Sequence, residues 1–336
     1  MPLENAEELP VETIFSGPAA STLGVQALIP PGETAVVVDI GGTTTDLALI
    51  LSGQPLLSSK GARVENQLTQ VRTLAVKSVP VGGDSALQQE GKDLLIGSGR
   101  LGPAYCMGGP APTPTDALRV LGLTELGDPV KAGEAMTGLG KPLNLSARDT
   151  AGKVIEMVVD RIASEVNNMF LDWEQEPVYL VWEVLQKKKV RPSLVAGVGG
   201  GASGFINQIA AKLGCDPYIP PYAPVANAIG AAVARPTMQV SLRADTEQGY
   251  YIIREEGFQD RLKDRHFNET KALALAKEKL IQRAAKYGLV VEPEEIEIIH
   301  REVFNMIRDW TTTGRLIDIT VQTPRGITGR IMKGDE

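Results

Sequence analysis

The stretch Ala35-Val36-Val37-Val38-Asp39-Ile40-Gly41-Gly42-Thr43-Thr44-Thr45-Asp46-Leu47-Ala48-Leu49-Ile50 decides the fold of this chain. An apolar run ends at Asp39, glycines and threonines follow, and Asp46 opens a second apolar run. Short apolar runs on either side of a glycine-rich turn are typical of two strands joined as a hairpin. The stretch therefore predicts a hairpin whose turn carries chemically useful groups.

The turn of this hairpin is suited to a phosphate. Glycines let a bound group approach the backbone, successive amides at such a turn can cradle an anion, and threonine hydroxyls add further donors. The expected phosphate-binding residues of the turn are Gly41, Gly42, Thr43, Thr44 and Thr45. Asp39 and Asp46 are hard oxygen ligands that could hold a phosphate-bound Mg²⁺, directly or through water. The alternative is an ordinary hairpin in which the threonines serve strand propensity alone.

Composition limits the other classes of function. The chain has 336 residues, of which 43% are hydrophobic, a net charge of -7, two cysteines and two histidines. An acidic chain without a basic run argues against a nucleic-acid partner, and no apolar stretch is long enough to predict a membrane span. The cysteine and histidine content argues against zinc, iron–sulfur and histidine-based catalysis. We expect a cytoplasmic protein.

Two further glycine-rich turns lie downstream. The first, Val79 to Ala86, offers backbone amides at Gly82 and Gly83. The second follows the apolar run that ends at Val198 and precedes an amphipathic segment that begins at Phe205. Strand, glycine-rich turn and helix is the order that places a nucleotide against a helix N-terminus, although the spacing fits a Rossmann dinucleotide site poorly. The candidate residues of this last turn are Gly199, Gly200, Gly201 and Ser203.

The rest of the first 236 residues is expected to form the strands, helices and loops around these turns. We expect a strand over Val11 to Phe15, a third strand from Leu56 to about Ser59, and a helix-like start after Gly83. Glycine and proline recur from Gly97 to Thr115, so this segment is expected to be a long ordered loop within an insert of about residues 97–145. Apolar spacings of three and four predict one long helix from Ala147 to about Asp172, and Val178 to Leu185 is a helix or a strand.

Beyond Pro236 the composition changes. Gln239 to Arg243 and Tyr250 to Arg254 are typical of a hairpin, and Asn268 to Tyr287 of a charged amphipathic helix. The apolar spacing from Ile296 to Ile307 predicts another helix, and Leu316 to Val321 a strand. Residues 237–336 are therefore expected to form an accessory α+β module, and residues 1–236 the main domain.

Taken together, these motifs resemble the actin-like ATPase superfamily and, within it, most closely the hydantoinase A / 5-oxoprolinase family. The motifs that carry the resemblance are Ser16-Gly17-Pro18-Ala19, Val38 to Asp46, Gly102-Pro103 to Gly108-Gly109, Pro112 to Ala117, and Gly199-Gly200-Gly201-Ala202. The resemblance implies an α/β fold of the actin-like ATPase (ribonuclease H-like) type, with a mixed sheet flanked by helices. It also implies that Asp39 to Asp46 is the second phosphate loop, Gly199 to Gly204 the adenosine-side turn, and Val225 to Ala234 the helix that connects two subdomains.

The resemblance further implies a reaction. Family members use ATP and Mg²⁺ to open a cyclic amide such as a hydantoin or 5-oxoproline, by phosphorylating its carbonyl oxygen so that water can attack. They often work with a second subunit, here expected to be of the hydantoinase B type, and a homo-oligomer is possible. The usual preceding domain, with its own Asp-Gly-Gly-Thr turn, is not matched in this sequence, so we expect activity to need a partner chain or domain.

Two alternatives stay open from the sequence. The first is a nucleotide-binding or assembly subunit of the same fold without its own turnover. The second is another enzyme of the superfamily, such as a small-molecule kinase or an ATPase activator of radical dehydratases. The activator would need cysteines that bridge a cluster at a dimer interface, and Cys106 and Cys215 lie in unsuitable contexts.

Overall fold

The computed structural model describes residues 6–7, 10–58, 61–64, 67–69, 71, 73–175, 190–264 and 266–331. The chain forms two compact units. The larger comprises Val11–Ala234 with Ile327–Glu336, and the smaller comprises Met1–Pro10 with Arg235–Gly326. Each unit has buried hydrophobic clusters of its own, as an independently packed domain requires.

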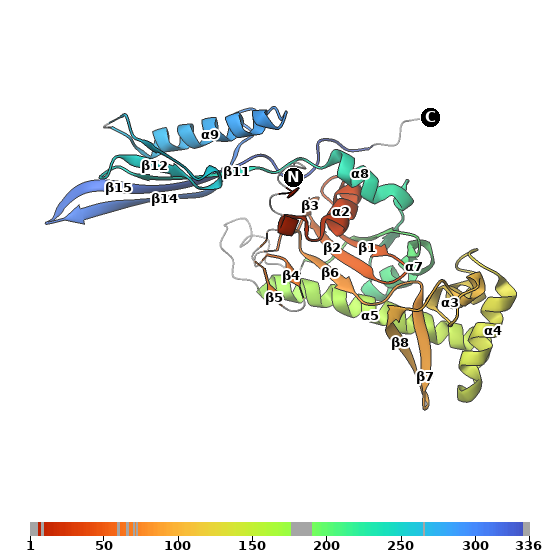
Figure 1. Ribbon diagram of the computed structural model, residues 1–336. Helices are drawn as coiled ribbons and strands as arrows, with labels where there is room; N and C mark the ends of the chain where they lie inside the picture. The colour runs from red at the N-terminus through yellow and green to blue at the C-terminus, as the bar shows by residue number, and fades with distance from the viewer. Residues whose placement is uncertain are drawn as a thin grey trace. The chain divides into compact units, whose positions relative to one another are not determined.

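A six-stranded mixed sheet forms the centre of the larger unit (Figure 1). Its strands are β1 (Ala35–Ile40), β2 (Thr45–Leu51), β3 (Gln54–Pro55), β6 (Val76–Val79), β9 (Leu194–Val198) and β10 (Asp216–Tyr218). The order is β10-β9-β1-β2-β3, and β6 also pairs with β2. β1 and β2 are antiparallel, whereas β9 runs parallel to both β1 and β10. The predicted hairpin is thus the middle of the sheet.

Helices cover both faces of this sheet. α5 (Ala147–Gln175) and α7 (Ala202–Leu213) share a buried cluster with Val36 and Val38 of β1. α2 (Ser16–Leu28) and α8 (Ala226–Val233) share another with Ala35 and Val37. Successive strand residues point to opposite faces, so a strand covered on both faces is apolar throughout. This double cover explains the continuous apolar run that ends at Asp39.

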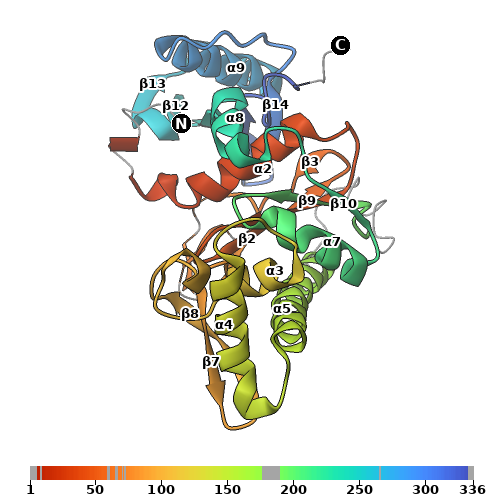
Figure 2. The same cartoon turned by 90° about the vertical axis from the view of Figure 1, so that its right-hand side faces the viewer.

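The main elements between β6 and α5 are a hairpin and three helical segments (Figure 2). They are β7 (Ser85–Glu90), β8 (Asp93–Arg100), η2 (Tyr105–Met107), α3 (Pro114–Leu121) and α4 (Pro129–Gly140). α3 and α4 pack against α5 and extend its buried cluster. The remaining short elements of this unit are η1 (Pro10–Thr13), β4 (Arg63–Val64), β5 (Gln67–Leu68), η3 (Lys141–Leu143) and η4 (Ala223–Val225).

The smaller unit is an antiparallel five-stranded sheet with one helix on it. Its order is β13-β12-β11-β15-β14. The bounds are β11 (Gln239–Asp245), β12 (Tyr250–Ile253), η5 (Arg254–Glu256), β13 (Phe258–Arg261), α9 (Glu269–Lys286), β14 (Glu297–Arg308) and β15 (Thr311–Gln322). α9 buries Ala272, Ala276 and Leu280 against this sheet. Figure 1 shows α9 lying along it.

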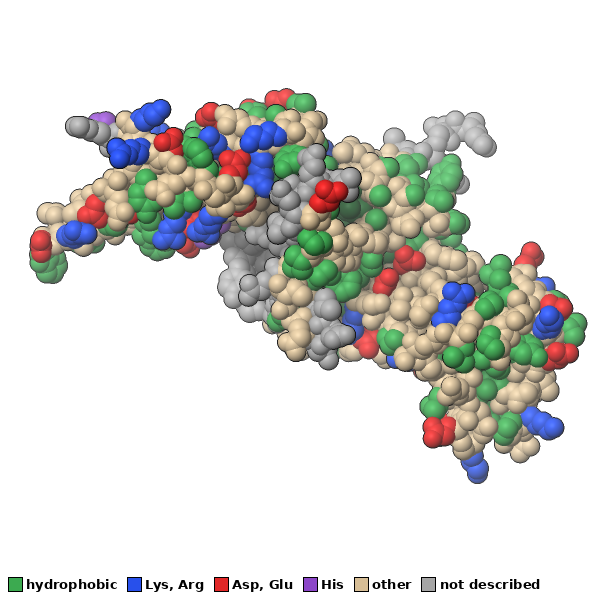
Figure 3. All heavy atoms as spheres, viewed as in Figure 1, with side chains coloured by type: hydrophobic (Ala, Val, Ile, Leu, Met, Phe, Trp, Pro, Cys, Tyr) green, Lys and Arg blue, Asp and Glu red, His purple; other side chains and the backbone are tan. Residues whose placement is uncertain are grey.

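The β14–β15 hairpin reaches past the rest of its sheet. β11 pairs with β15 only from Leu316 onward, so Thr311 to Arg315 pair with β14 alone. The two-residue turn consists of Asp309 and Trp310, with φ of 45° and 65°. Figure 3 shows hydrophobic side chains at the exposed tip of this hairpin.

Several sequence-based expectations are confirmed. The sheet is mixed and flanked by helices, and the C-terminal segment is an α+β module. The long helix from Ala147 is α5, and the strand, glycine-rich turn and helix around Gly200 are β9 and α7. α9 begins after Asn268, whose side chain accepts a hydrogen bond from the Lys271 amide. The segment Val178 to Leu185 lies outside the described residues.

Other expectations are wrong. Val11 to Phe15 is not a strand, because Pro10–Thr13 forms a 3-10 helix. The third strand is not Leu56 to Ser59: β3 and β6 pair with opposite ends of β2 instead. Both errors concern elements of two to four residues, whose pairing is decided by distant segments.

The expectations for the segments after Gly83 and for Ile296 to Ile307 are also wrong. The helix-like start is the strand β7, and the loop expected from Gly97 begins inside β8, a two-stranded hairpin where glycine is tolerated. Ile296 to Ile307 is the strand β14 rather than a helix. Its helical spacing is misleading because most of these apolar side chains face solvent instead of a core.

Candidate functional site

The site begins where β1 and β2 separate. Asp39 and Asp46 face each other across the two strands, and Ile40 faces Thr45. The Gly41 amide donates to the Thr44 carbonyl at 2.9 Å and closes the turn. The turn thus lies directly beyond a facing pair of carboxylates.

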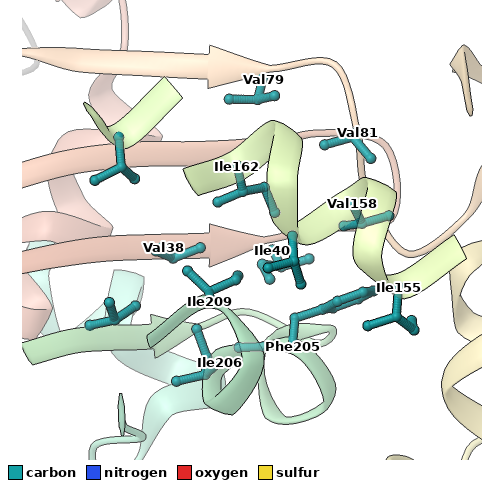
Figure 4. Packing of buried hydrophobic residues seen from close by; sticks show 14 of the residues in the cluster. Val38, Ile40, Val79, Val81, Ile155, Val158, Ile162, Phe205, Ile206 and Ile209 are labelled. Atoms are coloured by element: carbon teal, nitrogen blue, oxygen red, sulfur yellow. The ribbon is translucent and has the colours of Figure 1, made fainter. Parts of the chain in front are cut away.

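A packed core holds this end of the hairpin. Figure 4 shows Val38 and Ile40 of β1 among Ile155, Val158 and Ile162 of α5, with Phe205 and Ile209 of α7 beside them. Ile40 and Phe205 are at most 1% exposed. Because cores of this density leave little room for side chains to shift, the position of the turn is fixed by residues far apart in the sequence.

The turn at Gly82–Gly83 lies against the first turn. The Gly83 amide donates to the Gly41 carbonyl at 2.9 Å, and the Asp84 amide to the Gly42 carbonyl at 2.7 Å. A Cβ atom at Gly82 would lie 2.6 Å from the Gly41 oxygen, which is closer than real Cβ contacts. This second Gly-Gly pair is therefore needed for close packing of two backbones.

The turn after β9 lies against the other side of the β1–β2 turn. The Gly201 amide donates to the Ile40 carbonyl at 3.1 Å. Gly199 has a φ of +84°, and a Cβ atom there would lie 2.4 Å from Asp39 Oδ1. Glycine at this position thus meets both a backbone and a space requirement. The three glycine-rich turns that the sequence singled out all meet at one edge of the sheet.

Backbone donors divide into two groups at this edge. The amides of Gly41, Gly82, Gly83 and Gly201 donate to protein acceptors and hold the turns together. Within the part of the chain that the structure describes, no acceptor is found for the amides of Gly42, Thr43, Thr44, Gly199, Gly200 and Ser203. These amides are the donors that remain for a ligand.

Two predicted donors lie elsewhere than expected. Thr45 is fully buried, and its hydroxyl donates to the Val81 carbonyl at 2.7 Å. Ser203 lies exposed in the first turn of α7, away from the hydrogen bonds that join the turns. The hydroxyls of Thr43 and Thr44 are the ones that stay near the surface of the first turn.

The two aspartates differ in their surroundings. Asp39 accepts a hydrogen bond from the Ser21 hydroxyl of α2 at 2.7 Å. Burial raises the pKa of Asp46, the neighbouring Asp39 charge raises it further, and a hydrogen bond to Ser78 lowers it. Facing carboxylates repel each other, so a cation between them or beside them would be stabilised.

The carboxylate pair fits a Mg²⁺ that is shared with a ligand. In the described residues no group of three or more Asp, Glu, His or Cys side chains could hold a metal. Mg²⁺ is usually bound through one or two carboxylates together with substrate phosphates and water, so two aspartates beside free amides suffice. Ser21, Asp39 and Asp46 line a hollow beside this pair.

Three polar residues near the site escaped sequence reasoning. Ser21 reaches Asp39 because α2 crosses the hairpin. Asp84 forms an ion pair with Arg100 at 2.9 Å next to Gly42. The sequence around Asp84 and Arg100 gives no signal for this ion pair. The pair depends on the β7–β8 hairpin, which was expected to be a helix and a loop.

Asp116 organises the loop behind the second turn. It is fully buried, and its carboxylate accepts hydrogen bonds from the amides of Tyr105, Cys106 and Thr113 and from the Thr113 hydroxyl. Next to it, the Thr115 amide and hydroxyl both donate to the Gly83 carbonyl. The proline-rich motif before α3 therefore supports the Gly82–Gly83 turn.

Helices α2 and α8 cross in direct backbone contact. A Cβ atom at Gly24 would lie 1.8 Å from the Ala226 oxygen, and one at Gly230 1.8 Å from the Ala20 oxygen. The small residues of α8 thus serve helix packing. This crossing holds Ser21 over β1.

Comparisons with known proteins agree with this architecture. A family model described as hydantoinase/oxoprolinase matches residues 1–240, which include all three turns. A search of curated protein sequences finds no match.

Solved structures extend the comparison. The nucleotide-free structure of acetone carboxylase, from work on ATP-dependent acetone carboxylation, matches 96% of this chain and 51% of its own, with 16% identity and a TM-score of 0.63. The chain therefore spans about half the length of that relative. An activator of 2-hydroxyisocaproyl-CoA dehydratase from Clostridium difficile with bound ADPNP matches 64% of this chain and 63% of its own, with 16% identity and a TM-score of 0.34. An archaeal actin homologue in complex with ADP matches 63% and 53%, with 17% identity and a TM-score of 0.30.

The expected fold class is confirmed: the chain has a mixed sheet flanked by helices and a C-terminal α+β module, and it shares this fold with acetone carboxylase. None of the helices in the described residues is both long enough and apolar enough to span a membrane.

Proposed function

Because this chain belongs to the hydantoinase/oxoprolinase family, we propose that it is an ATP-dependent hydrolase that opens a cyclic amide of the hydantoin or 5-oxoproline type. The observation that carries the proposal is the meeting of three glycine-rich turns beside Asp39 and Asp46, with unpaired amides at Gly42, Thr43, Thr44 and Gly200. Amides and carboxylates at one edge match a ligand that brings phosphate and a divalent cation together.

The first turn binds the phosphates in this proposal. The amides of Gly42, Thr43 and Thr44 and the two threonine hydroxyls donate to phosphate oxygens. Gly41, Thr45, Gly82 and Gly83 act by shaping the turn, since their own donors are already used inside the protein. Preorganised donors of this kind stabilise developing charge because they need no rearrangement during the reaction.

The turn after β9 binds the adenosine side of the same nucleotide. Gly199 and Gly201 bring the turn against β1, and the Gly200 amide and exposed Ser203 face the ligand. The two turns thus contact different parts of one nucleotide.

Asp39 and Asp46 are proposed to hold Mg²⁺, with Ser21 orienting Asp39 through its hydrogen bond. When bound, Mg²⁺ supplies positive charge that offsets the charge of the phosphates. The raised pKa of Asp46 follows mainly from burial, and binding of a cation would favour its ionised form.

In the proposed reaction the γ-phosphoryl group of ATP moves to the carbonyl oxygen of the ring amide, and ADP leaves. Water then attacks the ring carbon, and the carbon–nitrogen bond breaks as the nitrogen takes up a proton, which leaves an acyl phosphate. A second water hydrolyses the acyl phosphate to the carboxylate and releases phosphate. Phosphoryl transfer depends chiefly on positioning and charge neutralisation, which this histidine-poor site can provide.

The remaining wall of the site is proposed to come from another domain or chain with its own phosphate-binding turn, and a hydantoinase B type subunit completes the enzyme. The match of this chain to about half of the acetone carboxylase chain supports this division. We place the ATPase core in residues 1–236 and the protein in the cytoplasm.

ATP hydrolysis that depends on a cyclic amide tests the proposal. ADP release is measured with hydantoin or 5-oxoproline, for the chain alone and for its complex with the candidate partner. The proposal expects ADP release only with ring and partner present, and its loss in Asp39→Asn. Absence of ring-dependent ADP release in the assembled complex would refute it.

A nucleotide-binding or assembly subunit without turnover is the second candidate. The specific observation in its favour is that the chain spans about half the length of the acetone carboxylase chain that it matches. Saturable Mg²⁺-dependent nucleotide binding without ADP release in the assembled complex would support this candidate over the hydrolase.

A further inference from the structure

β14 is an edge strand whose outer side pairs with no strand of the described chain. It has 12 residues, whereas β13 at the opposite edge has 4. Proteins usually protect an edge by keeping it short, by adding proline, charged side chains or β-bulges, or by covering it. β14 is long and contains no proline, and its register shifts lie at Ile298/His300 and at Met306/Ile307, so the backbone from His300 to Met306 is a regular edge that can receive another strand.

The outer part of this hairpin is also apolar. Phe304 is 54% exposed, Ile307 68% and Trp310 100%. Trp310 has a φ of 65° in a two-residue turn, a position that favours glycine. A bulky residue kept at a strained, fully exposed position points to a binding role.

The register with β15 assigns the side chains of β14 to two faces. Arg301 and Val303 face Ile319 and Ile317, which pack beneath α9, so odd-numbered residues of this segment lie on the α9 face. Glu302 and Phe304 face Asp318 and Leu316 on the other face. At the register shift between Met306 and Ile307 the extra residue, Thr313, lies on β15. Successive residues of β14 therefore still alternate, so Asn305 and Ile307 belong with Val303, and Met306 and Arg308 with Phe304.

Symmetry then restricts how two copies of this edge can pair. A two-fold axis that joins two identical strands into one antiparallel sheet stands perpendicular to the sheet and keeps every residue on its own face. Facing positions must therefore be an even number of residues apart.

We propose that β14 pairs with β14 of a second copy of this chain, with Asn305 on the two-fold axis. This register places Val303 against Ile307 on one face, and Phe304 against Met306 and Glu302 against Arg308 on the other. Each of these pairs occurs twice. Apolar pairs and opposite charges that face each other directly stabilise antiparallel strands.

Neighbouring registers are less complementary. An axis at Phe304 would set His300 against Arg308 and Arg301 against Ile307. An axis at Val303 would set Glu302 against Phe304. The register at Asn305 is therefore the one in which charges and apolar groups both match.

Glu302 and Arg308 are exposed and weakly paired, so they can form this contact between two copies. Glu302 has His300 as its ion-pair partner at 3.5 Å, and Arg308 has Glu247 at 3.5 Å. The Glu302 and Arg308 side chains are 51% and 73% exposed. Exposed pairs of this kind are weak, so they exchange partners at little cost.

Sedimentation of the full chain over a range of concentrations tests the proposal. The unaltered chain should form a reversible dimer. Glu302→Arg should abolish that dimer, and the double variant Glu302→Arg with Arg308→Glu should restore it. Glu294→Arg makes the same charge change at an exposed position away from the edge and should leave the dimer intact.

Site-directed crosslinking tests the register. A single cysteine in Asn305→Cys faces its own copy and should give a covalent dimer with a short thiol crosslinker. Arg301→Cys, four residues away on the same face, should not, and the unaltered chain controls for Cys106 and Cys215. A monomer at every concentration, or equal crosslinking at both positions, would overturn the proposal, and so would undiminished dimerisation of Glu302→Arg.

Discussion

Two β-hairpins of this protein, β1–β2 and β14–β15, have the same local structure but lie in opposite environments. β1 and β2 are buried along almost their whole length, and their turn is contacted by backbone from two other glycine-rich turns. β14 and β15 join through a two-residue turn, and the tip of their hairpin is exposed. The first hairpin is therefore fixed by its surroundings and can position chemical groups. The second presents its strand edge and its side chains outward.

The comparison predicts that the β1–β2 region tolerates almost no added atoms. The largest effect is expected for Gly24→Ala, because the new methyl group would lie 1.8 Å from the Ala226 oxygen and force α2 and α8 apart. We expect a loss of about 3 kcal/mol in the free energy of unfolding, at the upper end for overpacking. Urea denaturation measures it.

Gly17→Ala is the matched control for this change. It lies in the same helix, and a Cβ atom there meets nothing within 4 Å. Alanine should be neutral or slightly stabilising at this position. Equal losses in both variants would contradict the close crossing of α2 and α8.

The next effect concerns the third turn. Gly199→Ala adds a methyl group 2.4 Å from Asp39 Oδ1 at a φ of +84°. The strain and the contact together should cost about 2 kcal/mol and displace Asp39. Gly200→Ala, one residue later, meets nothing within 4 Å and should leave unfolding unchanged. Similar melting temperatures for the two variants would show that the turn does not pack on Asp39.

A smaller effect is expected at the carboxylate pair, where one substitution should change both the stability and the nucleotide binding of the protein. The pKa of Asp46 is raised in the folded state, so the folded protein favours the protonated form. Its contribution to stability is present below the ordinary pKa of 3.8 and is lost as pH rises through the raised pKa. Asp46→Asn should therefore show a smaller fall in unfolding free energy from acid to neutral pH, while binding Mg²⁺-nucleotide more weakly.

Urea denaturation across this pH range gives the first quantity, and calorimetric titration gives the second. Asp216→Asn changes another aspartate of the same unit that lies outside this edge, and it should alter neither. An Asp46→Asn variant with an unchanged pH profile would contradict the assigned burial and repulsion.

The smallest effect is expected at the exposed hairpin. Trp310→Gly removes a fully exposed side chain and relieves its positive φ, so the free energy of unfolding should rise by about 0.5 kcal/mol. The same change should weaken the proposed dimer, because Trp310 lies at the end of the paired edge. Greater stability with unchanged self-association would show that this tryptophan serves neither purpose.

The same comparison explains what sequence reasoning could predict. Asp39, Gly41 and the apolar runs beside them form a continuous local signal, and the hairpin was found from it. The β9 turn around Gly200 was found in the same way. Local patterns succeed where a segment is buried on both faces, because its composition then has little freedom.

Sequence reasoning failed where the environment is decided elsewhere. β14 has the apolar spacing of a helix, yet its partner β15 and its open edge make it a strand. β6 is a short segment that becomes a sheet strand only because β2 lies beside it. The roles of Ser21 and Asp84 depend on crossings between distant segments, which no local pattern records.

The central claim is that the turns at Gly42–Thr44 and at Gly200 bind one ligand together. It is tested most directly by titrating the protein, labelled with ¹⁵N in glycine and threonine, with Mg²⁺ and a non-hydrolysable ATP analogue. The account predicts that the amide signals of Gly42, Thr43, Thr44 and Gly200 shift along one saturation curve, and that Asp39→Asn removes the shifts. Shifts at one turn without the other, or none up to millimolar nucleotide, would contradict it.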